Sequence, residues 1–151
     1  MLNHLSRVFK QLIDGNDLSK QETMDESFAI ACMLLEVSNA DHTIDESESQ
    51  VLPTLIEKLC HVDAEQANTL IHRAKERIKQ STSLFEFTSH LRQLSQEQRI
   101  AVIESMWDVA HADGVIEPLE DAVIRKAAEL LYVDHSQFIR AKLNAAQRAE
   151  F

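Results

Sequence analysis

Apolar residues recur along the chain at the spacings of helical faces, and few β-branched runs interrupt them. Between these apolar segments stand helix start signals, each an oxygen-bearing side chain followed three residues later by Glu or Gln. The pairs are Thr23/Glu26, Asp63/Gln66, Ser83/Glu86, Ser95/Gln98 and Asp134/Gln137. The pattern predicts helices at about 2–14, 23–39, 46–60, 63–80, 84–92, 96–111, 118–132 and 135–149.

One glycine and one proline interrupt this pattern at positions that bear on where helices end or bend. Gly15 follows the first apolar segment and is expected to close its helix. Pro53 has no backbone N–H to donate, so it is expected in the first turns of the helix at 46–60 or at a kink.

Composition favours the same all-α fold. The chain has 151 residues, of which 44% are hydrophobic, and only two glycines and two prolines. This length suits one domain with a substantial core, and long helices with short connections suit so few helix breakers. We predict an N-terminal amphipathic helix and loop over residues 1–22, followed by one helical domain over 23–151.

A nine-residue acidic elbow occurs twice, at 40–48 and at 112–120. Both copies begin with Ala-Asp, carry an isoleucine three residues after the aspartate, and end in glutamate. Each copy joins two apolar-periodic segments in the same phase. The fold is therefore predicted to be a bundle of about seven to eight helices, built on two pseudo-repeated helix-elbow-helix hairpins that pack together.

The second elbow matches the latter half of an EF-hand loop at Asp113, Gly114, Ile116 and Glu120. The first half of that loop is missing, because Val109 stands where the opening aspartate belongs. A hard divalent cation such as calcium, magnesium or manganese is still a candidate ligand if both elbows come together. The candidate metal ligands are Asp41, Asp45, Glu48, Asp113, Glu117 and Glu120.

Helix capping and turn formation explain part of the same pattern. Glu48 and Glu120 suit the first turn of a helix, where acids are favoured by the helix dipole, and capping is the favoured interpretation for both. For Asp41 and Asp113 cation binding and turn formation stand about even. Glu36 and Asp108, one turn before the elbows, are expected to be solvent-facing charges rather than supports for a metal ligand, and His42 and His111 surface histidines.

Charge and motifs exclude several function classes. The formal net charge is −10, which repels nucleic-acid phosphates. The basic cluster Arg73, Lys75, Arg77 and Lys79 has no interleaved aromatic residue and is expected to be a solvated helix face. No glycine-framed serine, Cys/His constellation, phosphate-binding glycine loop or Glu-x-x-His pair occurs, so the chain is not expected to be an enzyme.

The N-terminus and the cysteines indicate a cytoplasmic protein. There is no signal-peptide core and no apolar run of transmembrane length. An amphipathic stripe in the first segment is expected to pack on the bundle, with peripheral contact to a membrane surface as the alternative. Its residues are Leu2, Leu5, Phe9, Leu12 and Ile13. Cys32 and Cys60 are expected to be buried free thiols.

The two elbows resemble those of the TerB-like family, the tellurite-resistance protein B domain, which also forms the helical middle region of membrane-anchored DnaJ-type co-chaperones. The resemblance rests on the two elbow motifs and spans roughly residues 23–149. It implies an all-helical bundle with the acidic elbows at one end, a divalent-cation site there, and a bacterial cytoplasmic role in tellurite or metal stress. His42 stands where the family usually has glycine, and neither a J-domain His-Pro-Asp motif nor a transmembrane segment occurs, so the co-chaperone role does not carry over.

Two functional hypotheses follow. The leading one is a non-enzymatic domain that binds a divalent cation through the elbows and takes part in the response to tellurite or metal stress. The alternative is a metal-independent protein-protein interaction module, co-chaperone-like or a scaffold at a membrane surface, whose elbows are only turns and caps. A protein partner is expected in either case.

Overall fold

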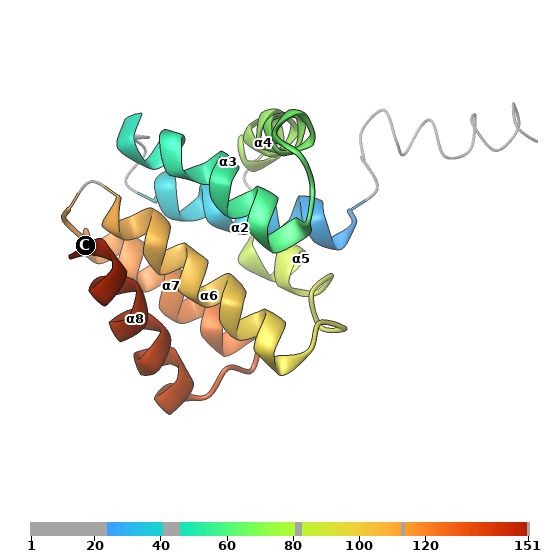
Figure 1. The fold of residues 1–151 in the computed structure, drawn as a ribbon. Coiled ribbons are helices and arrows are strands. Elements are labelled where there is room, and N and C mark those ends of the chain that lie inside the picture. The colour runs from blue at the N-terminus through green and yellow to red at the C-terminus, as the bar shows by residue number, and fades with distance from the viewer. Residues whose placement is uncertain (1–23, 41–45, 81–82, 113, 151) are drawn as a thin grey trace, which may run out of the picture.

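The computed structural model describes residues 24–40, 46–80, 83–112 and 114–150. These ranges contain seven α-helices and no strand (Figure 1), which confirms the all-α prediction. The predicted helix at 2–14 and its closing Gly15 lie outside the described residues. The helices are α2 (Glu26–Ser38), α3 (Glu46–Cys60), α4 (Ala64–Ile78), α5 (Leu84–Thr88), α6 (Gln96–His111), α7 (Pro118–Leu130) and α8 (His135–Ala149).

Side-chain caps fix where several helices begin. Asp63 and Ser95 form capping boxes with the glutamine three residues on, and Asp134 accepts a hydrogen bond from the Gln137 N–H at 2.9 Å. These three predicted starts are confirmed. Helix α2 begins later than predicted, because Asp25 is its cap and accepts a hydrogen bond from the Phe28 N–H at 2.7 Å.

Helix α5 is shorter than the predicted 84–92 and ends at Thr88. Its predicted capping pair does not form: Ser83 makes no side-chain cap, and the Glu86 carboxylate pairs instead with Arg77 of α4. Pro53 lies in the middle of α3 rather than in its first turns, and the alternative that it kinks the helix stays a prediction. A proline at that position leaves one carbonyl of the preceding turn without its helical partner.

Helix α2 lies at the centre of the bundle and packs against α3, α4, α5, α6 and α7 (Figure 1). Ten of its thirteen residues are buried, so it has no polar face of the kind that surface helices carry. Helices α2 and α6, the first members of the two repeated hairpins, pack on each other, and α8 covers α6. The predicted packing of one hairpin against the other is therefore present.

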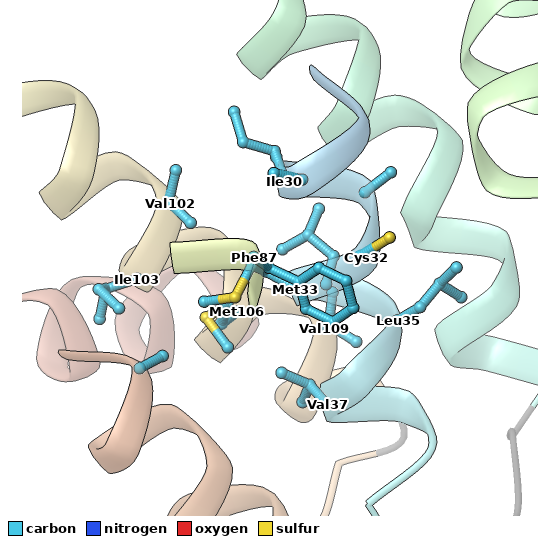
Figure 2. Packing of buried hydrophobic residues seen from close by; sticks show 14 of the residues in the cluster. Ile30, Cys32, Met33, Leu35, Val37, Phe87, Val102, Ile103, Met106 and Val109 are labelled. Atoms are coloured by element: carbon cyan, nitrogen blue, oxygen red, sulfur yellow. The ribbon is translucent and has the colours of Figure 1, made fainter. Parts of the chain in front are cut away.

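Figure 2 shows how the core forms where α2 meets α5 and α6. Met33 and Val37 of α2 lie near Met106 and Val109 of α6, and Phe87 of α5 lies among them. On the α8 side, the rings of Trp107 and Phe138 lie 5.5 Å apart between centroids. One continuous apolar cluster therefore joins both hairpins to the helices that cover them.

The basic residues of α4 and the two cysteines differ partly from expectation. Arg73 lies over the Phe28 ring at 5.0 Å, and the Lys79 Nζ is 3.2 Å from the Glu76 Oε1. With Arg77 paired to Glu86, much of the cluster is engaged within the fold. The thiol of Cys32 is buried as predicted, but that of Cys60 is partly exposed, because Cys60 ends α3 at the surface.

Two leucine truncations test the position of the core. Leu35→Ala removes a side chain that is fully buried in α2, and we expect it to lower the free energy of unfolding by about 2–5 kcal/mol. Leu143→Ala makes the same chemical change on α8, where the side chain is 62% exposed, and should change that free energy by less than about 0.5 kcal/mol. Urea unfolding followed by circular dichroism measures both, and equal losses would contradict the assignment of α2 to the core.

Candidate functional site

The helices that flank the two elbows end and begin on one side of the bundle (Figure 1). Helices α2 and α6 pack together and finish on that side, and α3 and α7 start there. This places the acids at the starts of α3 and α7 at the same end of the molecule. The family resemblance implied this arrangement, and in the described helices it follows from the packing of α2 on α6.

Three of the six predicted metal ligands, Asp41, Asp45 and Asp113, lie outside the described residues. Glu48 lies in the first turn of α3, and only its backbone is described. The two remaining candidates, Glu117 and Glu120, lie at the start of α7 and have described side chains.

Gly114 gives the second elbow its sharp turn. Its φ is +85°, a left-handed conformation that side-chain-bearing residues rarely adopt, and its N–H donates a 2.9 Å hydrogen bond to the His111 carbonyl. The turn allows the chain to leave α6 and enter α7 within a few residues. The prediction of a turn-forming Asp-Gly pair is consistent with this geometry at the glycine.

Glu120 is a buried carboxylate, 2% exposed, in the first turn of α7. Its Oε1 accepts a 2.9 Å hydrogen bond from the Glu117 N–H, one of the backbone donors that a helix start leaves without a helical partner. Pro118 occupies the first helical position, where its missing N–H costs no bond. The capping interpretation of Glu120 therefore agrees with the structure, while the Glu117 side chain is exposed.

The described residues fit only part of a cation site. Within the described ranges, no group of three or more His, Cys, Asp or Glu side chains is placed to share a metal ion. Glu117 and Glu120 supply oxygens of the type that calcium, magnesium and manganese prefer. A site with six carboxylates would therefore depend on Asp41, Asp45, Glu48 and Asp113 as well.

Asp108 does not face solvent as predicted but binds Arg148 of α8. The Arg148 Nη2 lies 2.9 Å from both Asp108 carboxylate oxygens, and Nη1 lies 3.3 Å from the Glu104 Oε1. Burial raises the pKa of Asp108 more than the Arg148 guanidinium lowers it. This ion pair joins α6 to α8 just before the elbow, and sequence reasoning missed it because the two residues lie forty positions apart.

Glu36, the repeat counterpart of Asp108, is also half-buried rather than solvent-facing. Burial raises the pKa of its carboxyl group. Asp108 has an arginine partner, whereas no hydrogen bond or ion pair to Glu36 occurs among the described residues. The two corresponding acids of the repeat therefore have different surroundings in the described part of the fold.

His111, at the end of α6, is half-buried rather than a surface histidine. Burial lowers its pKa more than the nearby Asp108 raises it, which favours the neutral imidazole. Its Nε2 and the Nε1 of Trp107, one turn earlier, are buried atoms without a hydrogen-bond partner among the described residues. Within the described residues His111 belongs to no group of three or more potential metal ligands, and His42 lies outside them.

Substitutions at Glu120 test its role as a cap. Glu120→Ala leaves the Glu117 N–H without its acceptor, and we expect the free energy of unfolding to fall by about 0.5–2 kcal/mol. Glu120→Gln keeps an accepting oxygen and should cost less. The control is Glu97→Ala, which removes an exposed acid from the first turn of α6. If the glutamine variant loses as much as the alanine variant, the negative charge itself is needed and capping is an incomplete explanation.

The raised pKa of Glu36 predicts a pH dependence of stability. A carboxyl group whose folded-state pKa exceeds its unfolded value of 4.5 favours folding when protonated, and this contribution is lost as pH rises through the folded pKa. Glu36→Gln should therefore be more stable than the parent protein at pH 7, and the gain should vanish below about pH 4.5. Thermal unfolding across pH 3.5–8 (roughly the range that brackets this titration) measures it. The control Glu76→Gln removes an exposed acid of α4, and an equal gain there would contradict the burial argument.

Comparison with known proteins agrees with this geometry. The family model described as "Tellurite resistance protein TerB" matches residues 27–143, which include both elbows and all the described helices apart from the first residue of α2 and the last six residues of α8. Searches of curated proteins and of solved structures gave no significant match. No helix in the described ranges is both long enough and apolar enough to cross a membrane. The match covers well over half of the chain and the elbow-bearing hairpins within it, and on this evidence the chain belongs to the TerB family.

Proposed function

We propose that the chain is a non-enzymatic TerB domain that binds a divalent cation through its two acidic elbows, as part of a response to tellurite or metal stress. The observation that carries this proposal is the position of the elbow-flanking helix ends on one side of the bundle (Figure 1). The proposed ligands are Asp41, Asp45, Glu48, Asp113, Glu117 and Glu120. Calcium, magnesium and manganese are the proposed cations.

Electrostatics supports a cation at this end. Like charges brought within a few ångströms repel each other unless a cation compensates, and the chain already carries a net charge of −10. One oxygen of Glu120 accepts a hydrogen bond from the Glu117 N–H. In a cation site Glu120 would therefore add negative charge while it holds the start of α7. The aspartates that precede each helix cap, Asp41 and Asp113, are the residues expected to matter most.

A metal-independent interaction module is the second candidate. It is favoured by two large apolar side chains at the second elbow, Val115 and Leu119, which are 59% and 54% exposed. Exposed apolar side chains beside a rigid helix start suit contact with a partner protein. On this view the elbow acids shape the turn and cap α3 and α7.

Thermal unfolding of chelator-treated protein, with and without calcium, magnesium, manganese or zinc, separates these candidates. A cation present at a hundred times its dissociation constant adds about 2.7 kcal/mol to stability, which for a chain of this size raises the melting temperature by roughly 5–10 °C. We expect such a rise with at least one ion, and its loss in the double variant Asp41→Asn, Asp113→Asn.

The matched control is the double variant Glu65→Gln, Glu76→Gln, which removes two exposed acids of α4 and should keep the rise. A rise that survives in the aspartate variant would place the cation elsewhere. No rise with any of the four ions would reject tight cation binding and leave the interaction module as the function.

A further inference from the structure

Three surface hollows meet at the start of α2, and Ser27 lines all of them. This is the point where residues 1–23 join the described fold. Two of the hollows are lined mainly by polar side chains, including Asp25, His90 and Gln66. The third hollow differs because apolar side chains make up more of its lining.

The third hollow, here named the α2–α3–α6 groove, lies between the start of α2, the end of α3 and the start of α6. Figure 1 shows these three helix ends on the same side of the bundle. The groove has a volume of about 370 Å³, and its floor is apolar. The apolar residues that line it are Ile30, Leu59, Leu94, Ala101 and Val102.

The rim of the groove carries groups of both charges and one thiol. Glu26 and Lys58 lie on it, and Cys60, the last residue of α3, also lines it. Cys60 is free and partly exposed, whereas Cys32 is fully buried in α2. The reactivity of the Cys60 thiol can therefore report whether the groove is covered, and the buried Cys32 serves as the reference thiol.

Residues 1–13 have the composition of an occupant for this groove. Leu2, Leu5, Phe9, Leu12 and Ile13 fall on one side of a helical wheel. The segment contains two bases and no acid, whereas the remainder of the chain carries 25 acids and 13 bases. An apolar stripe on a basic segment thus complements an apolar groove on a strongly acidic body.

We propose that residues 1–13 dock as an amphipathic helix in the α2–α3–α6 groove. The linker of residues 14–23 reaches about 35 Å when extended, and it joins the fold two residues before Glu26 and Ser27, which themselves line the groove. Docking within one chain needs little intrinsic affinity, because a short linker holds the segment at a millimolar effective concentration. The docked helix covers the Cys60 thiol.

The first test measures the reaction rate of Cys60 with a maleimide in the full chain. Phe9→Asp places a charge in the apolar stripe, and we expect Cys60 to react on the order of tenfold faster once the segment no longer covers it. Gln11→Asp adds the same charge on the opposite side of the helical wheel and should leave the rate unchanged. Cys60→Ser identifies the reacting thiol, since Cys32 is buried. Equal rates in all variants overturn the proposal.

The second test asks for contact directly and does not depend on a destabilising charge. Leu5→Cys, Phe9→Cys and Leu12→Cys are oxidised at low protein concentration, and at least one should form a disulfide with Cys60 within a single chain, because such a bond needs Cα atoms within about 7 Å. Gln11→Cys is the matched control. Cross-links only between two chains overturn the proposal in favour of a second copy as occupant. Binding of the parent protein to anionic lipid vesicles, with no intrachain disulfide in any variant, overturns it in favour of a membrane surface.

Discussion

The burial of α2 on all sides is the constraint on which the rest of the structure depends. Its residues from Phe28 to Leu35 are almost all fully buried, so water cannot solvate any face of it. A helix of this kind is stable only when other helices surround it. Helices α3 to α7 each contact it, and α8 covers the far side of α6. The arrangement of the bundle is thus the solution to covering one apolar helix of thirteen residues.

The acidic elbows follow from that constraint. Because α2 and α6 pack together and finish on the same side, the chain must turn twice at that end to begin α3 and α7. In the turn before α7 Gly114 supplies a residue with positive φ, and Glu120 supplies an acceptor for one of the N–H groups that the start of α7 leaves free. Glu120 therefore serves the backbone of α7 before any ligand, and cation binding there would use a charge that folding has already placed.

Many of the helix bounds could be predicted from the sequence, because a helix start depends on residues close to it in the chain. The starts of α4, α6 and α8 depend on caps within three residues, and α3, α6 and α8 match their predicted bounds. Two of the failures have a different cause, a partner on another helix. Glu86 pairs with Arg77 across a turn instead of capping α5, and Asp108 binds Arg148 of α8. The candidate site was predictable only as a repeat, since periodicity shows which acids correspond but not which oxygens converge.

The elbows and the α2–α3–α6 groove lie at opposite ends of α2. A helix of thirteen residues is about 20 Å long, which is more than twice the distance of roughly 8 Å over which physiological salt screens a charge. A cation at one end therefore exerts little direct electrostatic effect on a segment at the other. Any coupling between them has to pass through movement of α2 itself, and α2 is the helix that its neighbours hold most completely. The fold thus keeps an acidic end and an apolar groove as independent surfaces on one rigid core.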